Sequence, residues 1–139
     1  LVATPRAMGA LKDSGVLLDV LVGSATDPGE VYEPGALDPE PRVVVRTRSA
    51  SGGSWEATRS AGDGDGPPPW LPAERSGTWD PTALPDAPMD AYGCGDSFAA
   101  ALAYGLAAEM ALPDALELAA RCGAACRCGR GPYEGQLEG

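Results

Sequence analysis

Residues 90–100 read DAYGCGDSFAA, and this stretch places a flexible turn and an acid at the predicted start of a helix. Small residues occupy positions 93–95 and directly precede the carboxylate of Asp96. Apolar residues then recur every four positions, which predicts a helix over residues 97–108. The stretch therefore predicts a turn that presents an acid at the mouth of a helix.

This arrangement suits the binding of an anion. The first turn of a helix has unpaired backbone N–H groups and the positive end of the helix dipole, and small residues let an anion come close. A carboxylate beside such a site is useful when it accepts a proton, as a hydroxyl nucleophile requires during phosphoryl transfer. The alternative is an ordinary helix start, in which Asp96 is only a capping or first-turn acid.

The same stretch resembles the signature D-[TA]-x-G-A-G-D-x-F of the PfkB, or ribokinase-like, carbohydrate kinases. It differs from that signature at Cys94, where the family has a small residue such as alanine. The resemblance implies that Asp96 is the general base for a sugar hydroxyl. It also implies that the backbone of Gly93, Cys94 and Gly95 forms the anion hole for the transferring phosphate.

Elsewhere the chain predicts alternating strands and helices. Strands are expected at residues 1–4, 17–24, 42–47, 54–58 and 78–84, and helices at 7–14, from 27 onward, and at 112–126. The strand at 54–58 is expected to pair antiparallel with the one before it, across a Gly-Gly turn. The pattern predicts an α/β domain with a mainly parallel sheet.

Residues 60–77 have no apolar periodicity and are rich in Gly, Pro and Asp. Such a composition predicts a flexible insertion loop.

Composition and charge exclude several function classes. The net charge of -10 argues against nucleic acid as a partner, because phosphate backbones attract clustered Lys and Arg. The longest apolar run, near residues 98–112, is too short and too interrupted to span a bilayer. The chain has no histidine, so Ser-His-Asp and His-metal mechanisms are excluded within it. No signal peptide is seen, and a cytoplasmic location is expected.

The four cysteines, at positions 94, 122, 126 and 128, allow two interpretations. One is a cysteine-based metal-binding module. The other, which we favour, is small buried thiols in a reducing compartment, because no C-x-x-C pair is present.

Two further segments match family motifs. At the place of the N-x-x-E motif, which organises magnesium in the family, the chain has Asp27 and Glu30. The alternative for these residues is an ordinary acid pair at a helix start. At the place of T-x-G-x-x-G, which lines the ATP phosphates, it has Thr47, Ser49 and Gly52, with serine where the family has glycine. The alternative for this segment is a plain hairpin turn.

The family often binds a monovalent cation, such as K⁺, beside the anion hole. By resemblance, Asp90 is its side-chain ligand, with carbonyls from residues 127–131. The alternative is that Asp90 caps nearby amides. The predicted helix at 112–126 would flank the adenine.

The resemblance identifies residues 1–139 as the C-terminal, ATP-binding and catalytic portion of a ribokinase-like parallel-sheet sandwich. The expected activity is transfer of a phosphoryl group from ATP to the hydroxyl of a sugar or nucleoside, with Mg²⁺. An alternative is an inactive or weakly ATP-binding fragment that lacks the substrate half. The longer protein is expected to form a homodimer.

Overall fold

The computed structural model describes residues 1–137 and forms a five-stranded sheet in the order β1-β2-β3-β4-β5. β1, β2 and β3 are parallel, whereas β3, β4 and β5 are antiparallel. The strands are β1 (Val2–Ala3), β2 (Val20–Ser24), β3 (Val43–Thr47), β4 (Gly53–Ala57) and β5 (Ser76–Trp79). The helices are α1 (Met8–Leu11), α2 (Cys94–Ala107), α3 (Leu112–Cys126) and α4 (Gly131–Glu134).

The sheet is buried on both faces in its central strands. Val20 pairs with Val43 and Val22 with Val45, and all four side chains belong to one hydrophobic cluster. The intervening Leu21 and Val44 belong to a second cluster, because successive side chains of a strand point to opposite faces. A run of branched apolar residues without polar alternation is typical of such doubly covered strands.

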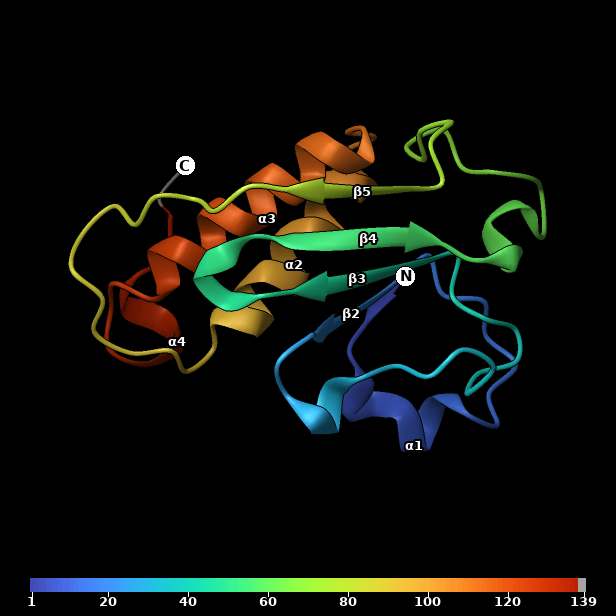
Figure 1. The fold of residues 1–139 in the computed structure, drawn as a ribbon, viewed down its shortest axis with the longest axis horizontal. Coiled ribbons are helices and arrows are strands. Elements are labelled where there is room, and N and C mark those ends of the chain that lie inside the picture. Colours follow the sequence, from blue (N-terminus) through green and yellow to red (C-terminus); the bar gives the residue numbers. More distant parts are fainter. Residues whose placement is uncertain (138–139) are drawn as a thin grey trace.

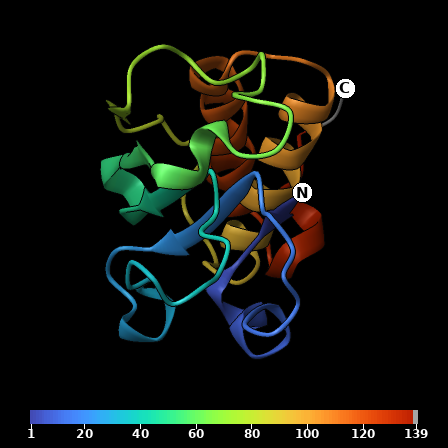
Figure 2. The same cartoon turned by 90° about the vertical axis from the view of Figure 1, so that its right-hand side faces the viewer.

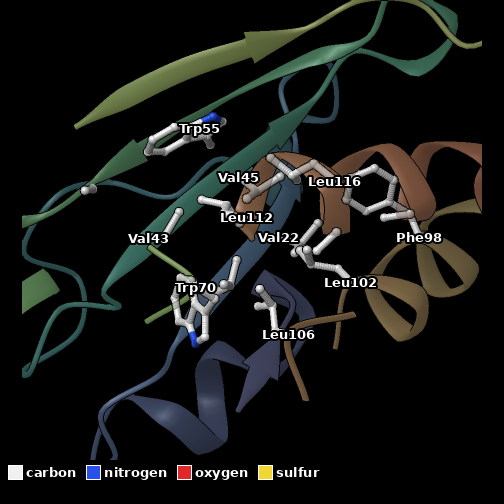
Figure 3. Packing of buried hydrophobic residues seen from close by; sticks show 14 of the residues in the cluster. Val22, Val43, Val45, Trp55, Trp70, Phe98, Leu102, Leu106, Leu112 and Leu116 are labelled. Atoms are coloured by element: carbon white, nitrogen blue, oxygen red, sulfur yellow. The ribbon is translucent and has the colours of Figure 1, made fainter. Parts of the chain in front are cut away.

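Helices α2 and α3 cover one face of the sheet and pack against each other (Figures 1 and 2). Their contribution to the main core centres on Leu102, Leu112 and Leu116, which are almost completely buried. Figure 3 shows these side chains meeting the valines of β2 and β3 and Trp55 of β4.

The opposite face carries a smaller cluster built from Leu18, Leu21, Tyr32, Leu37 and Val44. Met8 and Leu11 of α1 pack against it, and α1 lies on the side of the sheet away from α2 and α3 (Figure 1). The two-sided cover confirms the predicted α/β class.

The sheet contains more antiparallel pairing than the sequence predicts. A tight hairpin joins β3 to β4, and β5 returns alongside β4, so two of the four strand pairings are antiparallel. The predicted helix at 7–14 is only a turn of 3-10 helix, η1 (Pro5–Ala7), followed by the short α1. The helix expected after residue 27 is a single 3-10 turn, η2 (Pro28–Glu30).

Residues 60–77, for which the sequence predicts a flexible insertion loop, contact the rest of the domain at several points. Ala61 and Trp70 are buried in the main core, and the carbonyl of Trp70 accepts a hydrogen bond from the N–H of Leu112 at 2.8 Å. The Arg42 guanidinium also donates to the carbonyls of Ala61 and Gly66, each at 3.0 Å. The segment fixes one end of the sheet against the start of α3.

Among residues 1–137, no helix combines the length and the apolar character needed to cross a bilayer.

Candidate active site

A cleft of about 570 Å³ opens where β2 and β3 end and α2 begins. Ligands of α/β proteins commonly bind beyond the carboxyl ends of parallel strands. The hairpin after β3 and the first turn of α2 lie at the same end of the molecule in Figure 1. The cleft brings together nine of the ten predicted site residues: Asp27, Glu30, Thr47, Ser49, Gly52, Gly93, Cys94, Gly95 and Asp96.

The turn before α2 depends on Gly93. Its φ angle is +83°, and a side chain there would place Cβ 2.5 Å from the Cβ of Pro132. Within residues 1–137, the N–H groups of Gly93, Gly95 and Asp96 have no hydrogen-bond acceptor. The N–H of Cys94 makes a long contact of 3.4 Å to the carbonyl of Ala91. The start of α2 therefore presents open amides to the cleft.

Asp96 lies in the first turn of α2, with its side chain exposed at the cleft. Within the described part of the chain, its carboxylate accepts no hydrogen bond and forms no ion pair. It is therefore free to accept a proton from a bound group.

The thiol of Cys94 stays uncharged at neutral pH. Burial, with a further contribution from the neighbouring Cys126, raises the pKa of this thiol to about 11. A thiolate here would repel an anion, so the raised pKa leaves the open amides unopposed.

The two acids of the D-x-x-E motif occupy one corner of the cleft. Asp27 accepts a hydrogen bond from the N–H of Gly29 at 2.9 Å, and Glu30 accepts one from the N–H of Ser24 at 3.1 Å. Magnesium is commonly held by one or two carboxylates together with waters and phosphate oxygens, so this pair fits the ion.

The T-x-x-x-x-G segment forms the hairpin between β3 and β4. Thr47 ends β3, and Ser49 adopts φ = +52°, the left-handed conformation that glycine adopts most easily. The serine thus adopts a backbone conformation that a glycine would take without strain. Gly52 has a structural role, because a Cβ there would lie 2.1 Å from the carbonyl oxygen of Trp79.

Asp90 is the one predicted site residue that does not line the cleft. Its carboxylate accepts hydrogen bonds from the N–H of Tyr92 at 3.0 Å and of Gly131 at 3.1 Å. These bonds, Tyr92 first, hold the pKa of Asp90 below its usual value. The Arg127 carbonyl accepts from the N–H groups of both Met89 and Asp90. Asp90 thus caps amides, as in the alternative interpretation of the sequence.

The cysteines are not gathered into a cluster of metal ligands among residues 1–137. In the described part of the chain, no three acidic or cysteine side chains come close enough to hold an ion. All four thiols are free, and those of Cys94, Cys126 and Cys128 donate to carbonyls of Asp90, Tyr92 and Asp86, respectively. These hydrogen bonds connect the helices to the loop before α2, which argues against the metal-module interpretation.

Two arginines and an aromatic pair in the cleft were not predicted from the sequence. Arg6 and Arg127 line it, and Trp79 stacks on Phe98 with ring centroids 5.7 Å apart. Arg6 lies 24 residues from Glu30, with which it pairs, so no local spacing connects the two. Arg6 follows β1 and Glu30 follows β2, and these two strands are parallel neighbours. This relation between the strands is the only signal from which the ion pair could have been predicted.

The sequence profile of the family described as pfkB family carbohydrate kinase matches residues 66–138. This chain belongs to that family. The match confirms the resemblance carried by the G-x-G-D stretch and includes α2 and α3. A comparison with curated proteins finds no match.

Solved structures share the fold of this pfkB family chain. An E. coli protein assigned as ribokinase II, in complex with ATP and Mg²⁺, superposes with a TM-score of 0.65 at 23% identity over 96% of this chain. Aminoimidazole riboside kinase from Salmonella enterica, complexed with aminoimidazole riboside and an ATP analog, gives 0.64 at 18% identity over 94%. Fructokinase from Vibrio cholerae O395, in its fructose, ADP and calcium ion bound form, gives 0.58 at 22% identity over 84%.

The chain spans only part of these proteins: 40%, 42% and 37% of their lengths, in the same order. At these identities the likeness shows a partial ribokinase-like fold, as predicted.

Proposed function

We propose that this chain is the nucleotide-binding and catalytic part of a kinase that transfers the γ-phosphoryl group of ATP to a sugar or nucleoside hydroxyl. One observation carries the proposal: open amides at the start of α2, an unengaged carboxylate and an acid pair line one cleft. Its volume of about 570 Å³ is within the usual range for small-molecule sites.

In the proposed reaction, Asp96 accepts the proton of the acceptor hydroxyl. The hydroxyl oxygen then bonds to the γ-phosphorus while the bond between that phosphorus and the oxygen of the departing ADP breaks. The open amides of Gly93, Gly95 and Asp96 donate to the transferring oxygens, whose negative charge grows during transfer. The proposed anion hole uses the N–H groups of residues 93, 95 and 96, whereas the sequence predicts those of 93–95. The difference arises because the Cys94 amide already contacts the carbonyl of Ala91.

Asp27 and Glu30 would hold Mg²⁺ through their carboxylates and bound waters. The ion supplies charge neutralisation for the phosphate chain. Thr47 and Ser49, at the end of β3, face the same cleft and would contact the phosphates.

Replacing Asp96 tests the assignment. In the longer protein that contains this chain, Asp96→Asn should lower turnover by at least about a hundredfold, because general bases contribute roughly 10² to 10⁴. ATP affinity should stay nearly unchanged. The matched control is Asp114→Asn, since Asp114 holds the corresponding first-turn position in α3 and does not line the cleft. Normal turnover by the Asp96→Asn protein would contradict the proposal.

A second candidate is a chain that binds ATP without transferring phosphate. The observation that favours it is the partial length of the match: the chain spans 40% or less of the length of the first two solved structures that it matches. Incubating the 139 residues with ATP and a panel of sugars separates the two candidates. Sugar-dependent ADP release supports the kinase, whereas ATP binding without release supports the second candidate.

A monovalent cation held by Asp90 and carbonyls of residues 127–131 stays a prediction, as do a homodimer and a cytoplasmic location. The cation site is tested by measuring ATP affinity in K⁺ against tetramethylammonium. A site at Asp90 requires tighter binding in K⁺ and loss of that difference in Asp90→Asn.

A further inference from the structure

Arg6 lies across the acid pair of the cleft. It belongs to η1, directly after β1, and its Nε and Nη2 atoms each lie 2.9 Å from Oε1 of Glu30. Its Nη2 also lies 4.0 Å from Oδ2 of Asp27. One guanidinium therefore contacts both carboxylates that the proposed function gives to magnesium.

The two side chains of this ion pair differ in how firmly they are held in place. The Glu30 side chain is 18% exposed and is also fixed by the N–H of Ser24, whereas the Arg6 side chain is 73% exposed. Exposed ion pairs contribute little to stability, on the order of 0 to 1 kcal/mol. The guanidinium can therefore leave Glu30 at little cost, while the carboxylate stays in place.

Metal and guanidinium compete for the same oxygens. Oε1 of Glu30 already accepts a hydrogen bond from Nε of Arg6 and lies 2.9 Å from its Nη2, and Oε2 accepts the Ser24 amide. A cation that approaches this carboxylate meets both the positive charge of the guanidinium and an Oε1 atom that is already hydrogen-bonded. Binding of Mg²⁺ here requires Arg6 to move.

The destination of Arg6 is set by what else lines the cleft. The open amides of α2 form the other anion-binding wall, and Arg6 lines the same cavity. A guanidinium presents a rigid fork of donors that matches phosphate oxygens. A phosphate chain between the two walls would give Arg6 a new anionic partner.

We propose that Arg6 is a phosphate-binding residue that shields Asp27 and Glu30 before the nucleotide arrives and then exchanges them for the phosphate chain. The proposal rests on the proposed function and adds a residue to it. Metal and nucleotide then bind cooperatively. Metal binding requires Arg6 to leave the two carboxylates, and the phosphate chain gives Arg6 another anionic partner.

The experiment measures metal binding without nucleotide. Binding of Mn²⁺ alone to the chain, followed by electron paramagnetic resonance, should strengthen by up to about fivefold in Arg6→Gln, because the substitution frees the carboxylates. In a Glu30→Gln background, the same substitution should change Mn²⁺ affinity much less. The matched control is Arg59→Gln, which removes an exposed partner of Glu40 away from the cleft.

A second measurement uses nucleotides in the presence of Mg²⁺. Arg6→Gln should weaken ATP binding by about tenfold and AMP binding by much less, since the substitution removes charged donors to the phosphate chain. Unchanged or weaker Mn²⁺ binding overturns the proposal, as does equal weakening of ATP and AMP. Failure of the proposed function is a different result, namely normal turnover in Asp96→Asn.

Discussion

The carboxylate of Asp90 accepts a hydrogen bond at 3.1 Å from the N–H of Gly131, which lies 41 residues further along the chain. The bond joins the loop before α2 to the first residue of α4. It lies next to the close approach of Gly93 to Pro132. The geometry of the turn before α2 is thus fixed partly by the C-terminal segment.

Removing this carboxylate should destabilise the protein in a pH-dependent way. The backbone amides of Tyr92 and Gly131 lower the pKa of Asp90, so its contribution to stability is present above the unfolded pKa of about 3.9. That contribution is lost as the pH falls through the lower folded pKa. We expect Asp90→Asn to reduce the urea midpoint at pH 7, and the difference from the unsubstituted protein should shrink as the pH falls below about 3.9. Asp65→Asn, at an exposed loop position, should leave the midpoint nearly unchanged at either pH.

Two glycines of the turn should respond oppositely to alanine. A Cβ at Gly95 meets nothing within 4 Å, so Gly95→Ala should preserve or raise stability by up to about 1 kcal/mol. Its methyl group stands in the cleft and should weaken ATP binding. Gly93→Ala should cost about 1 to 3 kcal/mol, because of its positive φ and the clash with Pro132. Thermal unfolding and nucleotide titration separate the two effects, and unchanged ATP affinity in Gly95→Ala would contradict an anion site there.

Trp70 tests the anchoring of residues 60–77. Its side chain is buried in the main core, so Trp70→Ala should lower the free energy of unfolding by about 3 to 5 kcal/mol. Glu74→Ala, at an exposed position of the same segment, should change it by less than about 0.5 kcal/mol. Chemical denaturation measures both, and a loss below about 1 kcal/mol for Trp70→Ala would support the prediction of a flexible insertion loop.

The end of α2 offers a stabilising substitution. Glu109 has φ = +60°, and the N–H groups of Glu109 and Met110 donate to the carbonyls of Leu106 and Gly105 at 3.1 and 3.0 Å. This is the Schellman pattern, in which glycine is usual at the position of Glu109. We expect Glu109→Gly to stabilise the chain by about 0.5 to 1 kcal/mol. Glu117→Gly, in the middle of α3, should instead cost about 1 kcal/mol. Equal effects of the two substitutions on the unfolding midpoint would contradict this assignment.

The sequence predicted best where local signals agree with the tertiary structure. The valine run of β3 and the four-residue spacing of α2 identify elements whose apolar faces are buried. The prediction was poorer for residues 7–14, where only Met8 and Leu11 pack against the sheet. Two contacts support little more than one helical turn, since short helices depend on packing.

For the site, the motifs identified residues that meet in one cleft, because each follows a strand or begins a helix at the same end of the sheet. The ion pair of Arg6 with Glu30 had no signature in the sequence, since its partners follow different strands. The capping role of Asp90 was a stated alternative, and only the three-dimensional position of Gly131 could favour it.

The cleft is assembled from chain segments near residues 4–6, 22–30, 47–52, 79–98 and 120–127. No single segment presents a binding surface, so the unfolded chain should have little affinity for a nucleotide. Nucleotide binding at the proposed site would then shift the folding equilibrium of the whole domain, by about 2.7 kcal/mol at a hundred times the dissociation constant. The melting temperature of this protein should therefore rise with the nucleotide concentration around it, and removal of the nucleotide should lower the stability of the whole domain.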